Sequence, residues 1–205
     1  MKNNPKKLFL ILGKSASGKD SILKEVVSQL DISNAISFTT RPMRMNEKNL
    51  VDYEFITPED FKYKLSNNEI AEHVTYDVIN EQGESDQWHY GLSMNQLTKS
   101  PYIITIVNPI GFKTLENMEK FKDNIVSILI ETTSDKDRLL RMFNRDNITN
   151  QKCSEICRRY FADLDDFKDI MCDYIVYNDG DFNNAVKQVK NIIKEEIVGD
   201  NKINE

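Results

Sequence analysis

The segment "GKSASGKD", residues 13–20, places two glycines and two lysines within eight positions. Gly13 and Gly18 permit backbone conformations and close approaches that a side chain would block, so successive amide N–H groups can point at one anion. A helix that begins near Lys19 adds its positive N-terminal end. The long Lys19 side chain can then reach the terminal phosphates of a nucleotide and neutralise their charge. The segment therefore predicts a phosphate-binding loop.

The sequence on both sides of this segment supports the prediction. The apolar run "LFLIL", residues 8–12, is typical of a strand that is buried on both faces of a sheet. After the segment, apolar residues recur at helical spacing at positions 22, 23, 26, 27 and 30. Strand, loop and helix in this order are the context of a phosphate loop, whereas the alternative is an ordinary glycine-rich turn with exposed lysines. The residues expected to surround the phosphates of ATP are Gly13, Lys14, Ser15, Ala16, Ser17, Gly18, Lys19, Asp20 and Ser21.

Asp20 occupies the position at which a serine or threonine hydroxyl normally contacts magnesium. A carboxylate is also a hard oxygen ligand, and it brings a full charge. Ser21 could supply a hydroxyl instead, although a shift of one residue rotates that group by about 100° around a helix. We expect Asp20 to be the Mg²⁺ ligand, directly or through water.

The composition limits the class of protein. The 205 residues suffice for one domain with a substantial core, and the net charge of -6 gives no general attraction to nucleic acid or to an anionic membrane. Three cysteines are too few for a disulfide framework, and no apolar run is long enough for a signal peptide or a membrane span. We therefore expect a cytoplasmic protein that binds neither nucleic acid nor membrane.

Short apolar segments like the first strand recur at residues 102–107, 125–130 and 174–178, and each precedes a stretch with helical spacing. This alternation predicts an α/β fold with a doubly wound parallel sheet. Between residues 37 and 93, short and partly alternating strands predict an inserted β-rich subdomain. Residues 141–170 carry arginines among acidic residues in a helical stretch too polar to be buried all round, and this predicts a surface lid.

The stretch "SFTTRPMRMNEKNLVDYEF", residues 37–55, carries a second set of groups that can bind phosphate. Arg41 and Arg44 offer guanidinium forks for a dianionic phosphate, and Tyr53 adds one phenolic hydrogen bond. Two arginines and a tyrosine are also common as plain surface residues. The phosphate loop nearby in the sequence favours the anion site.

The order and spacing of these residues resemble the guanylate kinase family, from about residue 8 to residue 197. The resemblance then continues with Glu72 in "NNEIAEH" and with the pair Tyr90 and Gly91. It implies a P-loop NTPase fold in one domain, with a core at about 6–36 and 94–198, a GMP-binding insertion at about 37–93 and a lid at about 141–160. The residues that match the family's monophosphate signature are Ser37, Thr39, Thr40, Arg41, Arg44, Glu47, Asp52 and Tyr53.

The resemblance also implies a role for each matched residue. Glu72 would accept hydrogen bonds from the N1–H and N2–H₂ groups of guanine, which gives a large specificity factor; its alternative is a solvated carboxylate at a strand edge. The GMP-binding set implied is Ser37, Arg41, Arg44, Tyr53, Glu72, Tyr90, Gly91 and Asn108.

Further along, "ETTSDKDRLLRMFNRD" and "ICRRYFADLDDF" resemble the lid region of the family. They place Arg141, Arg145 and Arg159 at its arginine positions, where they would stabilise the equatorial oxygens in the transition state. The alternative is ordinary salt bridging on an exposed helix. "YIVYND" matches the last strand, with Asn178 near the adenine. The catalytic set implied is Lys19, Arg41, Arg141, Arg145 and Arg159.

The chain departs from the family pattern at several positions. Ile106 and Asn108 stand where carboxylates are expected, and Leu92 stands where a hydroxyl residue contacts guanine, with Ser93 as a substitute beside it. The polar stretch "INEQGESDQ" lengthens the segment before Tyr90. Asp20 in the loop would restore near magnesium the charge lost after the second core strand.

These features together predict a kinase that transfers the γ-phosphate of ATP to GMP or dGMP, with Mg²⁺ as cofactor and no covalent intermediate. The substrates are the only partners expected, and the protein would be a monomer or a homodimer. Two alternatives stay open. One is a kinase for another nucleoside monophosphate, and the other is a guanylate kinase-like module that binds a phosphorylated protein.

Overall fold

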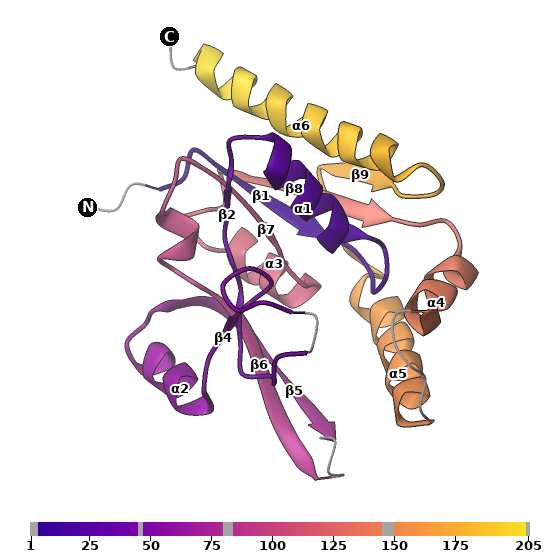
Figure 1. Cartoon of the computed structure of the whole chain (residues 1–205). Coiled ribbons are helices and arrows are strands. Elements are labelled where there is room, and N and C mark those ends of the chain that lie inside the picture. Colours follow the sequence, from indigo (N-terminus) through magenta and orange to yellow (C-terminus); the bar gives the residue numbers. More distant parts are fainter. Residues whose placement is uncertain (1–3, 45–46, 80–83, 145–149, 204–205) are drawn as a thin grey trace. The chain divides into compact units, whose positions relative to one another are not determined.

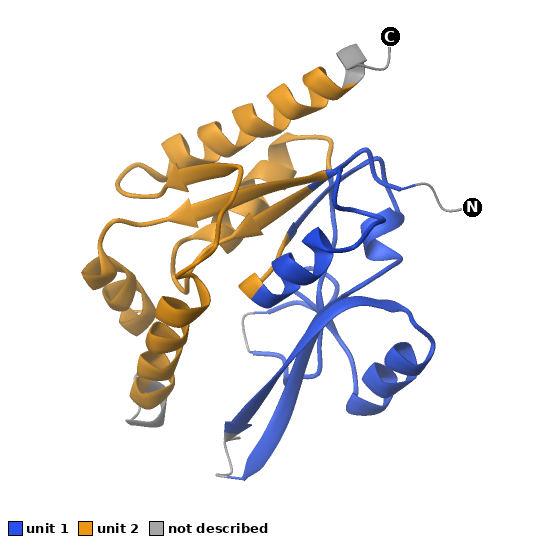
Figure 2. Cartoon of the chain, turned by 180° about the vertical axis from the view of Figure 1, so that it is seen from behind, with its two compact units in different colours: residues 1–8, 33–105, 110–124 blue, residues 9–32, 106–109, 125–205 orange. Residues whose placement is uncertain are grey.

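The computed structural model describes residues 4–44, 47–79, 84–144 and 150–203 (Figure 1). The chain divides into two compact units, which Figure 2 colours separately. The first unit comprises Met1–Leu8, Ser33–Thr105 and Ile110–Asn124, and the second comprises Phe9–Ile32, Ile106–Pro109 and Ile125–Glu205.

A five-stranded sheet, in the order β2-β7-β1-β8-β9, contains the apolar strands of the chain. Its strands are β2 (Ser33–Asn34), β7 (Tyr102–Ile106), β1 (Lys7–Leu12), β8 (Ile125–Glu131) and β9 (Tyr174–Tyr177). β2 runs parallel to β7, and β8 runs parallel to β9 with Ile128 opposite Tyr174. Leu8 to Leu12 are fully buried, as expected for a strand covered on both faces. The predicted α/β fold with a parallel sheet is confirmed.

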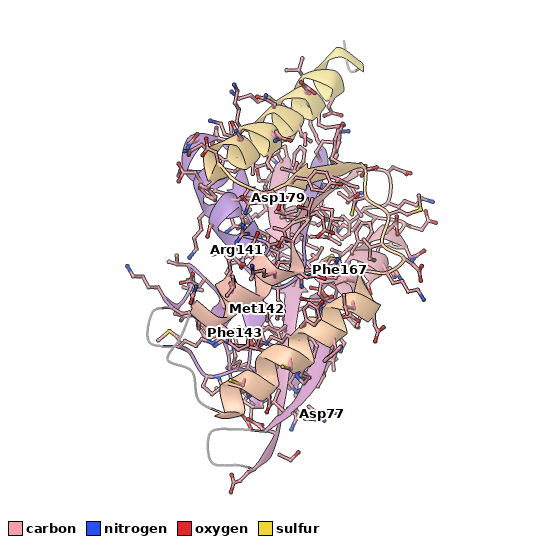
Figure 3. All side chains as sticks on the ribbon, turned by 90° about the vertical axis from the view of Figure 1, so that its right-hand side faces the viewer. Asp77, Arg141, Met142, Phe143, Phe167 and Asp179 are labelled. Atoms are coloured by element: carbon pink, nitrogen blue, oxygen red, sulfur yellow. The ribbon has the colours of Figure 1, made fainter. Side chains whose placement is uncertain are left out.

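In the second unit, α1 (Lys19–Gln29) packs against α6 (Phe182–Ile203) (Figure 1). Each helix buries residues at helical spacing: positions 22, 23 and 26 in α1, and 185, 186, 189 and 193 in α6. Two further helices, α4 (Asp135–Asn144) and α5 (Asn150–Asp166), pack against each other; Figure 3 shows α4 with Arg141 and Met142 labelled. These two helices cover most of the predicted lid.

In the first unit, a four-stranded sheet has the order β4-β3-β6-β5. Its strands are β4 (Glu54–Phe55), β3 (Phe38–Thr39), β6 (Ser85–Ser93) and β5 (Ile70–Ile79). The same unit contains the 3₁₀ helix η1 (Gln96–Thr98). It also contains the helix α3 (Pro109–Glu116) except for its first residue, Pro109, which belongs to the second unit. The sheet matches the β-rich stretch predicted at residues 37–93.

The insertion also contains a helix that the strand pattern did not indicate. α2 (Pro58–Ser66) begins after Thr57, whose hydroxyl accepts the Asp60 N–H at 3.0 Å, while the Asp60 carboxylate accepts the Thr57 N–H at 3.2 Å. This reciprocal capping box, followed by a proline at the first helical position, starts the helix locally. None of the helices in the described part of the chain is long and apolar enough to cross a membrane.

Candidate functional site

The predicted phosphate loop connects the end of β1 at Leu12 to the start of α1 at Lys19. Ala16 (φ 62°) and Gly18 (φ 93°) adopt left-handed backbone conformations, and the Ser17 N–H donates to the Lys14 C=O at 3.1 Å. Over the residues that the structure describes, the N–H groups of Ala16 and Gly18 donate no hydrogen bond. These amides, at the N-terminus of α1, are therefore available to an anion.

The loop is closely packed from behind. A Cβ on Gly13 would lie 2.5 Å from Ser17 Oγ and 2.7 Å from the Ile130 C=O, so only glycine fits there. A Cβ on Gly18 would overlap the side-chain amide of Asn178, which donates to the Ser17 C=O at 2.7 Å. The Ser17 hydroxyl is buried and has no hydrogen-bond partner within the described residues. Burying a hydroxyl without a hydrogen-bond partner costs free energy, so a ligand that hydrogen-bonds to Ser17 would remove this cost.

Charged side chains border the loop. Lys19 Nζ lies 3.9 Å from Asp20 Oδ2, and the Asp20 side chain is 54% exposed in the first turn of α1, where Ser21 is exposed too. Lys14 Nζ lies 3.6 Å from Glu131 Oε2 at the end of β8. Among the described residues no three His, Cys, Asp or Glu side chains gather as a metal cluster. Asp20 is thus a half-exposed carboxylate, a hard-oxygen donor, beside the loop.

Arg141 on α4 joins the loop to the end of β9. Its Nη1 donates to the Ala16 C=O at 3.4 Å and its Nη2 to the Asn178 C=O at 3.1 Å. The Asn178 N–H in turn donates to the Glu131 C=O at 2.9 Å. Two residues assigned by resemblance, Arg141 and Asn178, therefore lie at the loop.

The remaining lid arginines differ in their surroundings. Arg159 Nε donates to Glu155 Oε1 at 2.7 Å, and Arg158 binds both oxygens of the same carboxylate at 2.7 and 2.9 Å. Burial alone would raise the pKa of Glu155, but the hydrogen bonds from the two arginines lower it. Arg159 thus takes part in the salt bridging named above as the alternative. Arg145 lies outside the described residues.

In the first unit, alternation along the β5–β6 ladder separates two faces. On one face Glu72 is opposite Leu92 and Val74 is opposite Tyr90. The other face packs on α2, where the Phe61 ring stacks on His89 with ring centroids 4.0 Å apart. Glu72 and Tyr90 therefore share one face of the sheet, opposite the face that packs on α2.

Arg41 is held beside this face. Its side chain is only 4% exposed; Nη1 and Nη2 bind the two oxygens of Glu47 at 3.0 and 2.8 Å. The guanidinium lies 5.6 Å from the ring centroids of both Tyr53 and Phe55, and the Tyr53 ring meets the Tyr90 ring edge-on at 6.0 Å. Arg41, Tyr53 and Tyr90 are therefore brought together.

Glu47 also engages Arg44, whose N–H donates to Glu47 Oε2 at 2.9 Å while its side chain is 53% exposed. Burial works to raise the pKa of Glu47, but the hydrogen bonds from Arg41 and from the Arg44 N–H hold it below its ordinary value. Ser37, on the chain before β3, accepts the Glu54 N–H at its C=O at 2.9 Å. Glu47, which matches the family signature, thus binds both the Arg41 guanidinium and the Arg44 N–H, a role that the signature alone did not indicate.

Glu72 is 8% exposed, and burial raises the pKa of its carboxyl to about 7. Glu72 is therefore not the solvated carboxylate at a strand edge that was named as its alternative. Leu92 opposite is fully buried, and Ser93 Oγ accepts the Gln96 N–H at 3.3 Å. Glu72 is thus a buried carboxyl whose raised pKa comes from burial.

The last two residues predicted to bind GMP are Gly91 and Asn108. A Cβ on Gly91 would lie 2.7 Å from the Phe38 ring and 3.0 Å from His73 Cβ, so glycine lets three strands approach. Asn108 follows β7 and belongs to the same unit as the phosphate loop, whereas the other residues of the GMP-binding set belong to the first unit.

Sequence reasoning missed one pair at the loop. Arg138 on α4 is fully buried and binds Asp163 on α5, with Nη2 and Oδ2 2.9 Å apart. Its spacing from Asp135 is that of an ordinary helical salt bridge, and nothing in the sequence indicates the partner 25 residues away.

Proteins of known family and structure resemble this chain. The crystal structure of guanylate kinase from Anaplasma phagocytophilum matches with a TM-score of 0.63 and 21% identity, covering 96% of this chain and 88% of that chain. The chain thus shares the fold of that guanylate kinase structure.

A family model described as guanylate kinase matches residues 5–196. The guanylate kinase of Legionella pneumophila (strain Paris) is 29% identical over 193 residues, which are 93% of this chain and 87% of that protein. The guanylate kinase of Malacoplasma penetrans (strain HF-2) is 27% identical over 199 residues, 96% of this chain and 97% of its own length. The chain belongs to the guanylate kinase family.

Proposed function

We propose that this protein transfers the γ-phosphate of ATP to GMP, giving ADP and GDP. The observation that carries the proposal is the phosphate loop. Within the described residues its Ala16 and Gly18 amides and its buried Ser17 hydroxyl have no hydrogen-bond partner, and Arg141 donates to the Ala16 C=O. The acceptor is proposed from the relatives, which are named guanylate kinases.

The donor would be held through its phosphates. The loop amides and Lys19 bind the β- and γ-phosphoryl oxygens, and Arg141 adds a cation where charge develops during transfer. Arg145 and Arg159 complete this clamp by resemblance to the family. Asn178 orders the loop through the Ser17 C=O, a role that adds to its assignment near the adenine.

Magnesium fits this donor site. Mg²⁺ usually keeps several waters and binds through one or two carboxylates together with substrate phosphates, which is the donor set that Asp20 and ATP provide. When bound, the ion neutralises charge on the phosphates. Asp20 would hold it beside Lys19, directly or through water.

The acceptor would be bound by the first unit. The exposed guanidinium of Arg44 and the phenol of Tyr53 are suited to its phosphate, with Arg41 supplying buried positive charge. Ionised Glu72 would accept the donor groups of the guanine edge. Exclusion of water during transfer would prevent hydrolysis of ATP.

A kinase for another base is the second candidate, and one observation favours it. Leu92, fully buried opposite Glu72, cannot supply the hydroxyl that the family uses for guanine, and Ser93 Oγ accepts a backbone N–H instead. The base pocket therefore differs from the family pattern more than the phosphate loop does.

The test is a coupled assay of ADP formation from ATP with GMP, dGMP, AMP, UMP and CMP in turn. We expect turnover with GMP or dGMP. Turnover with another base alone would favour the second candidate. Binding of nucleotide without any transfer would overturn the kinase proposal and favour a binding module.

A further inference from the structure

By volume, Arg138 is the largest fully buried side chain in the described residues, and all its terminal nitrogens donate hydrogen bonds. Nε donates to the Ser15 C=O at 3.2 Å, Nη1 to Asp135 Oδ1 at 2.7 Å, and Nη2 to Asp163 Oδ2 at 2.9 Å. The Tyr160 ring lies 5.7 Å from the guanidinium carbon, and its hydroxyl donates to the other Asp135 oxygen at 2.9 Å. A buried charge is tolerated only when it is paired and hydrogen-bonded in this way.

The same ion pair engages both backbone polar groups of one loop residue. The Ser15 N–H donates to Asp163 Oδ2 at 2.8 Å, while the Ser15 C=O accepts from Arg138. The two side chains come from α4 and α5, two helices that overlap the predicted lid, although Arg138 itself precedes it. The first part of the phosphate loop is thereby held by two helices at once.

We infer that Arg138 and Asp163 are positioning residues for the phosphate loop. By holding the Ser15 peptide groups they set the direction of the next amides, those of Ala16 and Gly18, which donate no hydrogen bond within the described residues. Asp163 already occupies the Ser15 N–H, so it directs a phosphate to the amides that follow. The inference rests on the proposed function only in taking ATP as the ligand of the loop.

The test replaces the pair by apolar side chains of similar size, in Arg138→Met with Asp163→Leu. Such replacement of a buried ion pair is often neutral for stability, so the variant separates folding from positioning. In the full-length protein we expect the KM for ATP to rise about tenfold, the size expected for loss of charge-assisted contacts. The KM for GMP should change less than about twofold and the melting temperature by only a few degrees.

A second readout needs no activity. Hydrogen exchange of the backbone amides in residues 13–19 should become faster in the nucleotide-free double variant. The matched control is Asp173→Asn, because Asp173 Oδ2 accepts the Ser127 N–H at 2.8 Å in the same unit but away from the loop. Asp163→Asn should speed exchange in the loop, whereas Asp173→Asn should leave both loop exchange and the KM for ATP unchanged.

Two outcomes would overturn the inference. One is a folded double variant with wild-type loop exchange, and the other is an equal rise of the KM for ATP and for GMP. If the wild-type protein transfers no phosphate, the proposed function fails, while faster loop exchange in the double variant would still support the positioning role.

Discussion

The side-chain amide of Asn178 donates a hydrogen bond to the Ser17 C=O at 2.7 Å, in the space that a Cβ on Gly18 would fill. The end of β9 therefore shapes the phosphate loop from behind. Because Gly18 also has a φ of 93°, both sterics and backbone conformation select glycine at this position.

Substitution of Gly18 by alanine should impair the donor site. The left-handed conformation would cost about 1–2 kcal/mol in a non-glycine residue, and Asn178 would have to move. We expect at least about a tenfold weaker binding of ATP, measured by titration with a fluorescent ATP analogue. Gly199→Ala in α6 is the control, because the added Cβ would meet no described atom within 4 Å beyond its chain neighbours and the backbone of its own helix, and helical alanine is favourable. Equal ATP affinity in Gly18→Ala and wild type would contradict the prediction.

Asp20 should determine the dependence of activity on magnesium. In Asp20→Asn the carboxylate charge is lost, so the Mg²⁺ concentration for half-maximal activity should rise several-fold. A rise of this size is expected when one charged ligand contact is lost. Asp20→Ser should recover part of the loss, because a hydroxyl is the usual ligand at this position. Magnesium titrations of turnover that coincide for wild type and both variants would remove the role.

The sequence predicted the parts of this protein whose signal is local. The continuous apolar run before Gly13 indicated a strand buried on both faces, and β1 is that strand. α2 was not predicted, because its signal is a capping box at Thr57 and Asp60 and not an alternation of apolar and polar residues. The hydrogen bond from Arg138 to the Ser15 C=O could not be predicted, since it depends on tertiary packing between distant segments.

Register explains another part of what the sequence could not reveal. The ladder slips by one residue between Ile70 and Glu72, and this irregularity decides which β5 side chains share the face of Tyr90. The resemblance to the family singled out Glu72, yet the burial of its carboxyl opposite Leu92 depends on that register.

Glu72 should give the protein a characteristic pH dependence. Its folded pKa of about 7 lies above its ordinary value of 4.5, so its contribution to stability is fully present below pH 4.5 and is lost as the pH rises through 7. Between these values the free energy of unfolding of wild type should fall relative to Glu72→Gln, by about 3 kcal/mol. Urea unfolding of both proteins from pH 4.5 to 8 measures this difference. A free energy of unfolding that depends on pH in the same way in both proteins would contradict the prediction.

The same group should couple pH to acceptor binding. Guanine donates to Glu72 in the proposed mode, and only the ionised carboxylate accepts from two donors. The KM for GMP should therefore rise as the pH falls below 7, while in Glu72→Gln it should be high and nearly independent of pH. A wild-type KM for GMP that is constant from pH 6 to 8 would argue against this contact.

Glu47 should support both folding and acceptor binding, through Arg41. Glu47→Ala leaves the guanidinium of Arg41, whose side chain is 4% exposed, buried without its carboxylate, so the free energy of unfolding should fall by about 3 kcal/mol. Because the pKa of Glu47 is held below its ordinary value, the wild-type contribution is present at neutral pH and is lost as the pH falls through the folded pKa. Glu119→Ala, which breaks the exposed pair with Lys122, should change stability by less than about 1 kcal/mol.

A double variant separates these two roles of the Arg41–Glu47 pair. Arg41→Met with Glu47→Leu removes both charges together, so stability should return close to that of wild type. The KM for GMP should nevertheless stay high, because positive charge for the phosphate and the anchor for the Arg44 N–H are both gone. Denaturant unfolding and steady-state kinetics on the same samples distinguish the effects. Recovery of the KM together with stability would show that the pair serves folding alone, since no charge would remain at either position to bind the acceptor.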